Sequence, residues 1–131
     1  MEFRTILPIE QPPNQIKMGQ HILTMGSCFA NSIGQRFIDT KFKVEVNPFG
    51  VIYDPISSAR LIQMALDQEV PMDSSYIESQ GIHHNLFAHS EFYGLSKQEV
   101  ELKISGRLSV TRNMLKNADW IFFTFGTANI Y

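Results

Sequence analysis

Cysteine is almost absent from this sequence: the 131 residues include only one, Cys28. A single thiol cannot form an internal disulfide, and it excludes every metal site that needs several cysteines. This usage fits a reducing compartment, so we expect a cytoplasmic protein. We expect neither a metal ion nor an organic cofactor.

The sequence also carries little net charge. Its 11 Lys and Arg oppose 13 Asp and Glu, which gives a formal net charge of −2 at pH 7 with the histidines neutral. The basic residues are spread along the chain, so they form no patch for a phosphate backbone and nucleic acid is not an expected partner. Charged residues make up 18% and hydrophobic residues 44%, a balance that is typical of a folded domain.

Long apolar runs are missing as well. No segment approaches the roughly 20 consecutive apolar residues that span a bilayer, and Arg4 and Pro8 interrupt any signal-peptide core at the start. We therefore expect no membrane association. Residues 1–19 hold three of the six prolines and little periodicity, which predicts an extended leader packed over the edge of the domain.

After the leader, short apolar runs alternate with helical patterns, which is typical of βαβ units around a mostly parallel sheet. The apolar run 21–25 leads directly into Gly26 and Ser27. A stripe of apolar residues every four positions then predicts an amphipathic helix: Phe29, Ile33 and Phe37, widened by Ala30 and Ile38. The sequence thus predicts a strand, a Gly-Ser turn and a helix in direct succession.

The rest of the chain repeats this alternation. Residues 42–46 read as a strand with one covered face, Asp54-Pro55 starts a helix that ends near Gln68, and a capping box over 96–99 starts another. The run 120–125 is almost continuously apolar, as expected of a central parallel strand. Between them, 69–94 is irregular, with short strands expected around 76–77 and 86–87.

Three polar turns follow the predicted strands: Gly26-Ser27, Asn47 to Gly50, and Gly126-Thr127. In parallel sheets, ligands bind where the carboxyl ends of the strands meet, so we expect these turns to converge. The hydroxyl of Ser27 is then a candidate nucleophile, and its amide a candidate oxyanion donor near the positive end of a helix. The pattern by itself favours a simpler interpretation, in which Ser27 caps the helix and Gly50 serves a turn.

The turns also carry a family resemblance. Residues 26–30 spell GSCFA, the pentapeptide after which the GSCFA domain family is named, and residues 47–55 and 124–128 resemble its next two blocks. The match runs from about Ile22 onward. The family is grouped with SGNH (GDSL-like) hydrolases, so the resemblance implies a three-layer α/β/α sandwich with a mostly parallel sheet. It also implies that residues 1–131 are the N-terminal part of an incomplete domain of this kind.

The resemblance implies hydrolysis or transfer of an acyl ester, from a small molecule or a saccharide, through a serine. Carried over, Ser27 is the nucleophile, and the oxyanion hole is built from Ser27, Gly50, Gly126 and Thr127. Asn47 and His89 are weaker candidates for substrate binding. In the third block the wider superfamily has an asparagine two residues after the glycine, where this sequence has Ala128, with Asn129 one residue later.

The general base of such enzymes is missing from the sequence pattern. None of the four histidines follows Asp or Glu by three residues, which is the spacing that the superfamily uses near its C-terminus. A serine hydroxyl is a poor nucleophile without a base, so we expect this chain to be inactive by itself. The strand over 120–125 would also form an apolar edge, which predicts a homo-oligomer or a longer protein.

Three other interpretations remain open. Cys28 could be the nucleophile, although at the start of the helix we expect it to point under the sheet, flanked by Phe29. His83, His84 and His89 could bind a metal, although their spacing is not that of a standard ligand set. The chain could also be a non-catalytic binding module that keeps the fold without the chemistry.

Overall fold

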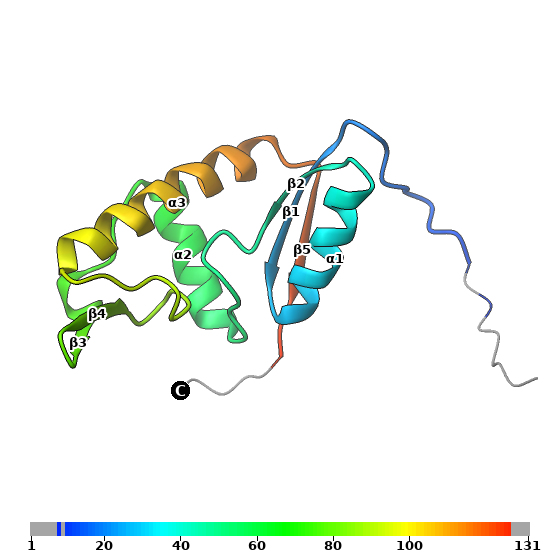
Figure 1. The fold of residues 1–131 in the computed structure, drawn as a ribbon. Helices are drawn as coiled ribbons and strands as arrows, with labels where there is room; N and C mark the ends of the chain where they lie inside the picture. Colours follow the sequence, from blue (N-terminus) through cyan, green and yellow to red (C-terminus); the bar gives the residue numbers. More distant parts are fainter. Residues whose placement is uncertain (1–7, 9, 127–131) are drawn as a thin grey trace, which may run out of the picture.

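The computed structural model describes residue 8 and residues 10–126. Helices and strands alternate along this part of the chain (Figure 1). In order, they are β1 (His21–Gly26), α1 (Cys28–Asp39), β2 (Lys43–Val46), α2 (Pro55–Asp67), the 3-10 helix η1 (Asp73–Ser75), β3 (Tyr76–Ser79), β4 (Ile82–Asn85), α3 (Lys97–Asn117) and β5 (Trp120–Thr124). None of these helices is long and apolar enough to cross a bilayer.

The main sheet has three parallel strands in the order β2-β1-β5. β1 is central and almost fully buried, because α1 covers one face of the sheet while α2 and α3 lie on the other (Figure 1). The predicted α/β class with a parallel sheet is confirmed, and the layers are those of an incomplete α/β sandwich. β5 lies at the edge of the described sheet, with Ile121 and Phe123 each 41% exposed.

The core forms between β1, α2 and α3. Met25 of β1 packs with the fully buried Phe49, and helix side chains complete this cluster, among them Leu61, Val100 and Ile104. Phe49 belongs to the turn that follows β2. Burial of that side chain therefore anchors the predicted second turn against the end of the central strand.

The irregular segment contains a hairpin. β3 was expected around 76–77 and forms there, but the strand expected around 86–87 is wrong, since β4 ends at Asn85. Gln80 and Gly81 connect the two strands with positive φ values of 53° and 77°, as in a type I′ turn. Sequence reasoning missed this turn because glutamine rarely takes the first of these positions.

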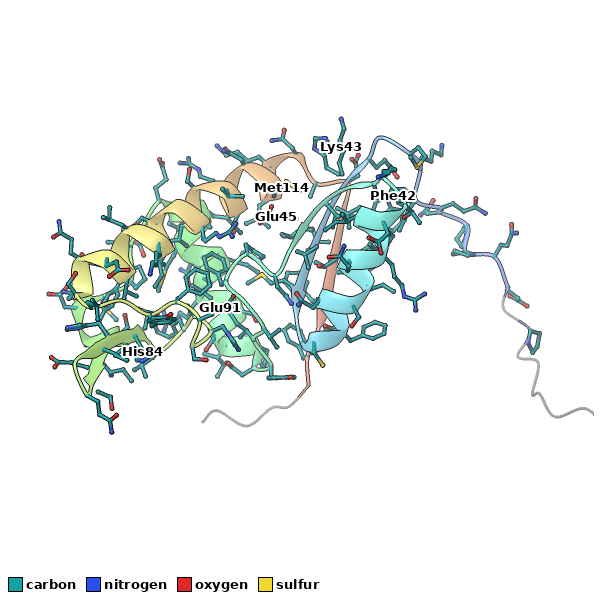
Figure 2. The ribbon with its side chains drawn as sticks, viewed as in Figure 1. Phe42, Lys43, Glu45, His84, Glu91 and Met114 are labelled. Carbon is teal, nitrogen blue, oxygen red and sulfur yellow. The ribbon has the colours of Figure 1, made fainter. Side chains whose placement is uncertain are left out.

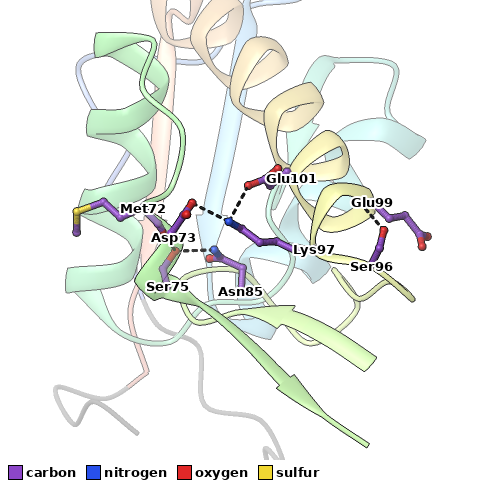
Figure 3. Close-up of polar contacts among 8 residues, drawn as sticks. All are labelled: Met72, Asp73, Ser75, Asn85, Ser96, Lys97, Glu99 and Glu101. Atoms are coloured by element: carbon purple, nitrogen blue, oxygen red, sulfur yellow. Dashed lines mark hydrogen bonds and ion pairs between the residues drawn. The ribbon is translucent and has the colours of Figure 1, made fainter. Parts of the chain in front are cut away.

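Side-chain contacts hold the hairpin region to the start of α3 (Figure 3). Lys97 Nζ lies 2.7 Å from Asp73 Oδ1 and 3.5 Å from Glu101 Oε1. The Asp73 carboxylate raises the pKa of Lys97 above its ordinary value. Asp73 is exposed and the other two side chains are only partly buried, so the ion pairs contribute little to stability.

The predicted leader differs from expectation. Its described residues, 8 and 10–19, form no helix or strand, and their side chains are mostly exposed. They run away from the body of the protein instead of packing over its edge (Figure 1). The stretch 10–19 contains only two large apolar side chains, Ile16 and Met18, which gives it little surface to bury.

Candidate active site

Ser27 lies between β1 and α1, as predicted. Its backbone is extended, and its side-chain oxygen accepts a hydrogen bond of 3.2 Å from the amide of Phe29, so Ser27 is the N-cap of α1. The residue is 8% exposed. The capping role is thus established, and it places the hydroxyl at the positive end of a 12-residue helix, where negative charge is stabilised.

The hydroxyl of Ser27 has a second partner, on β5. Ser27 Oγ and Thr124 Oγ1 lie 2.8 Å apart, and the parallel register pairs Gly26 with Thr124. Sequence reasoning did not single out Thr124. The signal that identifies it is the pairing of two strand ends, which becomes visible only once β1 and β5 are known to be neighbours.

Gly26 allows this close pairing of β1 with β5. Its φ is 127°, a value that L side chains rarely adopt, and a methyl group at this position would overlap the carbonyl oxygen of Thr124. A backbone carbonyl in a sheet cannot move aside as a flexible side chain can. The glycine is therefore required for the geometry that brings Ser27 and Thr124 together.

Asn47 holds the same turn from the opposite side. Its Oδ1 accepts from the amide of Gly26 at 2.8 Å, while Nδ2 donates to Asn31 Oδ1 at 3.1 Å and to the carbonyl of Ser27 at 3.4 Å. The residue is buried. Its placement does not support the predicted substrate contact, because the amide group is used inside the protein; Asn47 instead positions the Ser27 turn.

The predicted oxyanion donors already donate hydrogen bonds within the protein. The amide of Ser27 donates to the carbonyl of Thr124 at 2.7 Å, that of Gly50 to Asn47 at 2.8 Å, and that of Gly126 to Tyr53 at 3.2 Å. The last bond joins the third turn to Tyr53, three residues after the second turn. Nearby, the amide of Ile52 donates to the carbonyl of Gly26 in the first turn. The three turns converge as expected, yet none of these amides is free to bind an oxyanion in this conformation.

Parts of the third block lie outside the described residues. Thr127 is one of them, so the structure gives no placement for this predicted donor. The same holds for Ala128 and Asn129, where the sequence departs from the superfamily pattern.

His89 lies against the second turn. Its amide donates to the carbonyl of Phe49 at 3.0 Å, and its side chain packs on Gly50. Its imidazole is 40% exposed. No histidine in the described part of the chain hydrogen-bonds Ser27 Oγ, whose partners there are Thr124 and the amide of Phe29.

The histidines do not assemble a metal site within the described residues, where no three His, Cys, Asp or Glu side chains lie close enough to hold an ion. His83 lies 3.9 Å from Glu78, and the ring of His84 neighbours that of Tyr93.

Cys28 does not point under the sheet. Both Cys28 and Phe29 are exposed. Of the predicted stripe, Ala30 is buried and Phe37 packs on Phe122 of β5, whereas Phe29 and Ile38 face outward. A hydrogen bond to the Cys28 thiol raises the pKa of Tyr53 above its ordinary value. The thiol therefore lies on the outer rim of the site, beside the Tyr53 hydroxyl.

Comparison with known families identifies the chain. The sequence model of the GSCFA family matches residues 21–131, which include the Ser27, Asn47 and Thr124 segments. This protein belongs to the GSCFA family. No match was found among curated proteins or solved structures. The matched segment begins at β1 and leaves out the leader, and it includes every helix and strand described above.

Proposed function

We propose that this chain carries the nucleophile, Ser27, of a GSCFA domain that hydrolyses or transfers acyl esters of small molecules or saccharides in the manner of SGNH-type hydrolases, but that it is inactive without a base. The observation that carries this proposal is the position of the Ser27 hydroxyl. It lies at the carboxyl end of the central strand and at the N-terminus of α1, 2.8 Å from Thr124 Oγ1. A helix N-terminus stabilises the negative charge that a serine oxygen acquires as it attacks a carbonyl.

The described residues position this hydroxyl without activating it. Thr124 can orient the Ser27 oxygen, but a threonine hydroxyl does not accept a proton near pH 7. We therefore expect no serine-dependent ester turnover from this chain, because a base must come from a group other than those bonded to Ser27 here. A base histidine and its acidic partner remain part of the proposal for the family's chemistry.

A non-catalytic binding module is the second candidate function. The engaged amides of Ser27, Gly50 and Gly126 favour it, since an esterase needs free donors for the oxyanion. The two candidates differ in what they require of position 27. A nucleophile must be reachable by an acyl donor, whereas a helix cap in a binding module need not be.

Replacing the hydroxyl by a thiol tests the proposal without a base, because a thiolate is itself the nucleophile and forms readily at a helix N-terminus. The chain would carry Ser27→Cys together with Cys28→Ser, which removes the native thiol. We expect p-nitrophenyl acetate to acylate the introduced thiol, releasing one equivalent of p-nitrophenolate, about tenfold faster than an ordinary thiol on the same helix.

Ser32→Cys in the same Cys28→Ser background is the matched control. Ser32 belongs to α1, one turn after Cys28, and its side chain is exposed. Intact-mass spectrometry would count the acetyl groups, and urea denaturation would show that both variants fold. Equal acylation rates at positions 27 and 32 would contradict the nucleophile assignment and favour the binding module.

A further inference from the structure

The loop between β4 and α3 brings an imidazole and a carboxylate onto the second turn of the site. Gly50 has a φ of 77°, and a methyl group there would overlap the Cβ of His89 and lie 2.6 Å from Glu91 Oε1. The amide of His89 also bonds the carbonyl of Phe49. Figure 2 places Glu91 in this loop, beside the connection from β2 to α2. Gly50 thus accommodates the loop, which fixes His89 next to the second turn.

The hydrogen bonding of His89 indicates which ring nitrogen carries the proton. The amide of Glu91 donates to His89 Nδ1 at 3.3 Å, whereas the Glu91 carboxylate lies 3.7 Å from Nδ1, beyond hydrogen-bond range. A nitrogen that accepts a hydrogen bond has no proton in the neutral ring, so the proton resides on Nε2. When the ring is protonated, Nε2 still carries its hydrogen. His89 therefore presents an N–H donor from Nε2 in either state.

A donor is what the site otherwise lacks. The amides of Ser27, Gly50 and Gly126 already donate within the protein, while the His89 ring is 40% exposed and makes no described hydrogen bond through Nε2. We propose that His89 Nε2 binds the carbonyl oxygen of the acyl group presented to Ser27. This inference rests on the proposed function, and it names the oxygen-binding group of the site: a neutral or cationic imidazole instead of the expected backbone amides.

The test uses the chain with Ser27→Cys and Cys28→Ser. In that chain the thiolate attacks the acyl carbon, the carbonyl π pair moves onto oxygen, and its return expels p-nitrophenolate. His89→Phe keeps a ring but removes the donor, so we expect acylation by p-nitrophenyl acetate to slow by about 100-fold, as when one oxyanion donor is lost. Alkylation of the same thiol by iodoacetamide develops no oxyanion, and its rate should be unchanged. His89→Gln, which retains an N–H donor, should restore most of the acylation rate.

The acylation and alkylation rates together support or overturn the role proposed for His89. If His89→Phe slows alkylation as much as acylation, or slows neither, His89 does not bind the acyl oxygen, although Ser27 can still be the nucleophile. If the introduced thiol at position 27 reacts no faster than that at position 32, the proposed function fails and this inference fails with it. Long-range 1H–15N spectra of the unmodified chain test the inference independently of Ser27. A proton residing mainly on Nδ1 of His89 would overturn the assignment of His89 Nε2 as the donor.

Discussion

Gly26→Ala is expected to lower the free energy of unfolding by about 3–5 kcal/mol, enough to unfold much of the population of a domain of this size. The added methyl would overlap the carbonyl oxygen of Thr124, and the φ of 127° is unfavourable for alanine. Relief requires β1 and β5 to separate at the Ser27 turn, which costs ladder hydrogen bonds and strains the backbone. Urea denaturation followed by circular dichroism measures the change.

Gly106→Ala is the matched control for this substitution. Gly106 is exposed within α3, and nothing lies within 4 Å of the position that a methyl group would occupy. Alanine there should stabilise the protein by about 0.5–1 kcal/mol through its helix propensity. The opposite signs of the two Gly→Ala changes are the expected result. A Gly26→Ala variant as stable as the parent would show that β1 and β5 are not paired as described.

Asn47→Ala is expected to cost about 2–4 kcal/mol, because it leaves buried polar groups without partners. The amide of Gly26 loses its acceptor, and Asn31 loses the donor that Asn47 provides. Asn47 also adopts a positive φ of 40°, which asparagine tolerates better than alanine. Without the hydrogen bonds of Asn47, the Ser27 turn should also be held less firmly. The acylation rate of a thiol introduced at position 27, relative to one at position 32, should therefore fall.

Two variants calibrate this effect. Asn113→Ala removes an exposed asparagine of α3 and should change stability by less than about 0.5 kcal/mol. Asn47→Asp keeps an acceptor for the Gly26 amide but loses the Nδ2 donor, so its cost should be intermediate. If Asn47→Ala is no more destabilising than Asn113→Ala, Asn47 does not hold the Ser27 turn, and its assignment as a positioning residue is wrong.

Local sequence signals predicted much of the fold. The succession from β1 through Ser27 to α1 follows from a strand run, a Gly-Ser turn and a helical stripe, and Asp54 caps α2 ahead of Pro55 as expected. Glu99 and Ser96 form most of the expected capping box: the Glu99 amide donates to Ser96 Oγ, but the Glu99 carboxylate reaches back to the amide of Leu95 and not to that of Ser96. These features depend on neighbours in the sequence, which is why they were predictable.

The features that were missed depend on partners far apart in the sequence. The inner face of α1 includes Gly34, which packs against Val46, where a methyl group would lie 2.5 Å from Val46 Cγ2. A glycine carries no hydrophobic signal, so the periodicity did not single out Gly34, and it wrongly included the exposed Phe29. The bond between Ser27 and Thr124 spans 97 residues and requires the strand order. The placement of His89 on Gly50 depends on a loop whose path no periodicity describes.

The location of the candidate site was predictable from the sequence, but its hydrogen bonds were not. The rule that parallel strands end together was sufficient to gather the three turns around Ser27. It could not reveal that the amides of Ser27, Gly50 and Gly126 would already donate to backbone carbonyls of the protein, because hydrogen-bond pairing depends on register and on the exact path of each turn. The same limit applies to Asn47, which lies where substrate contact was expected but faces inward.

The most direct measurement of whether Ser27 marks an acyl site needs no base: it is the ratio of the rates at which p-nitrophenyl acetate acylates thiols introduced at positions 27 and 32, each in the Cys28→Ser background. The account predicts a ratio of about ten, because a thiolate at position 27 lies at the N-terminus of α1. A ratio of one would contradict it.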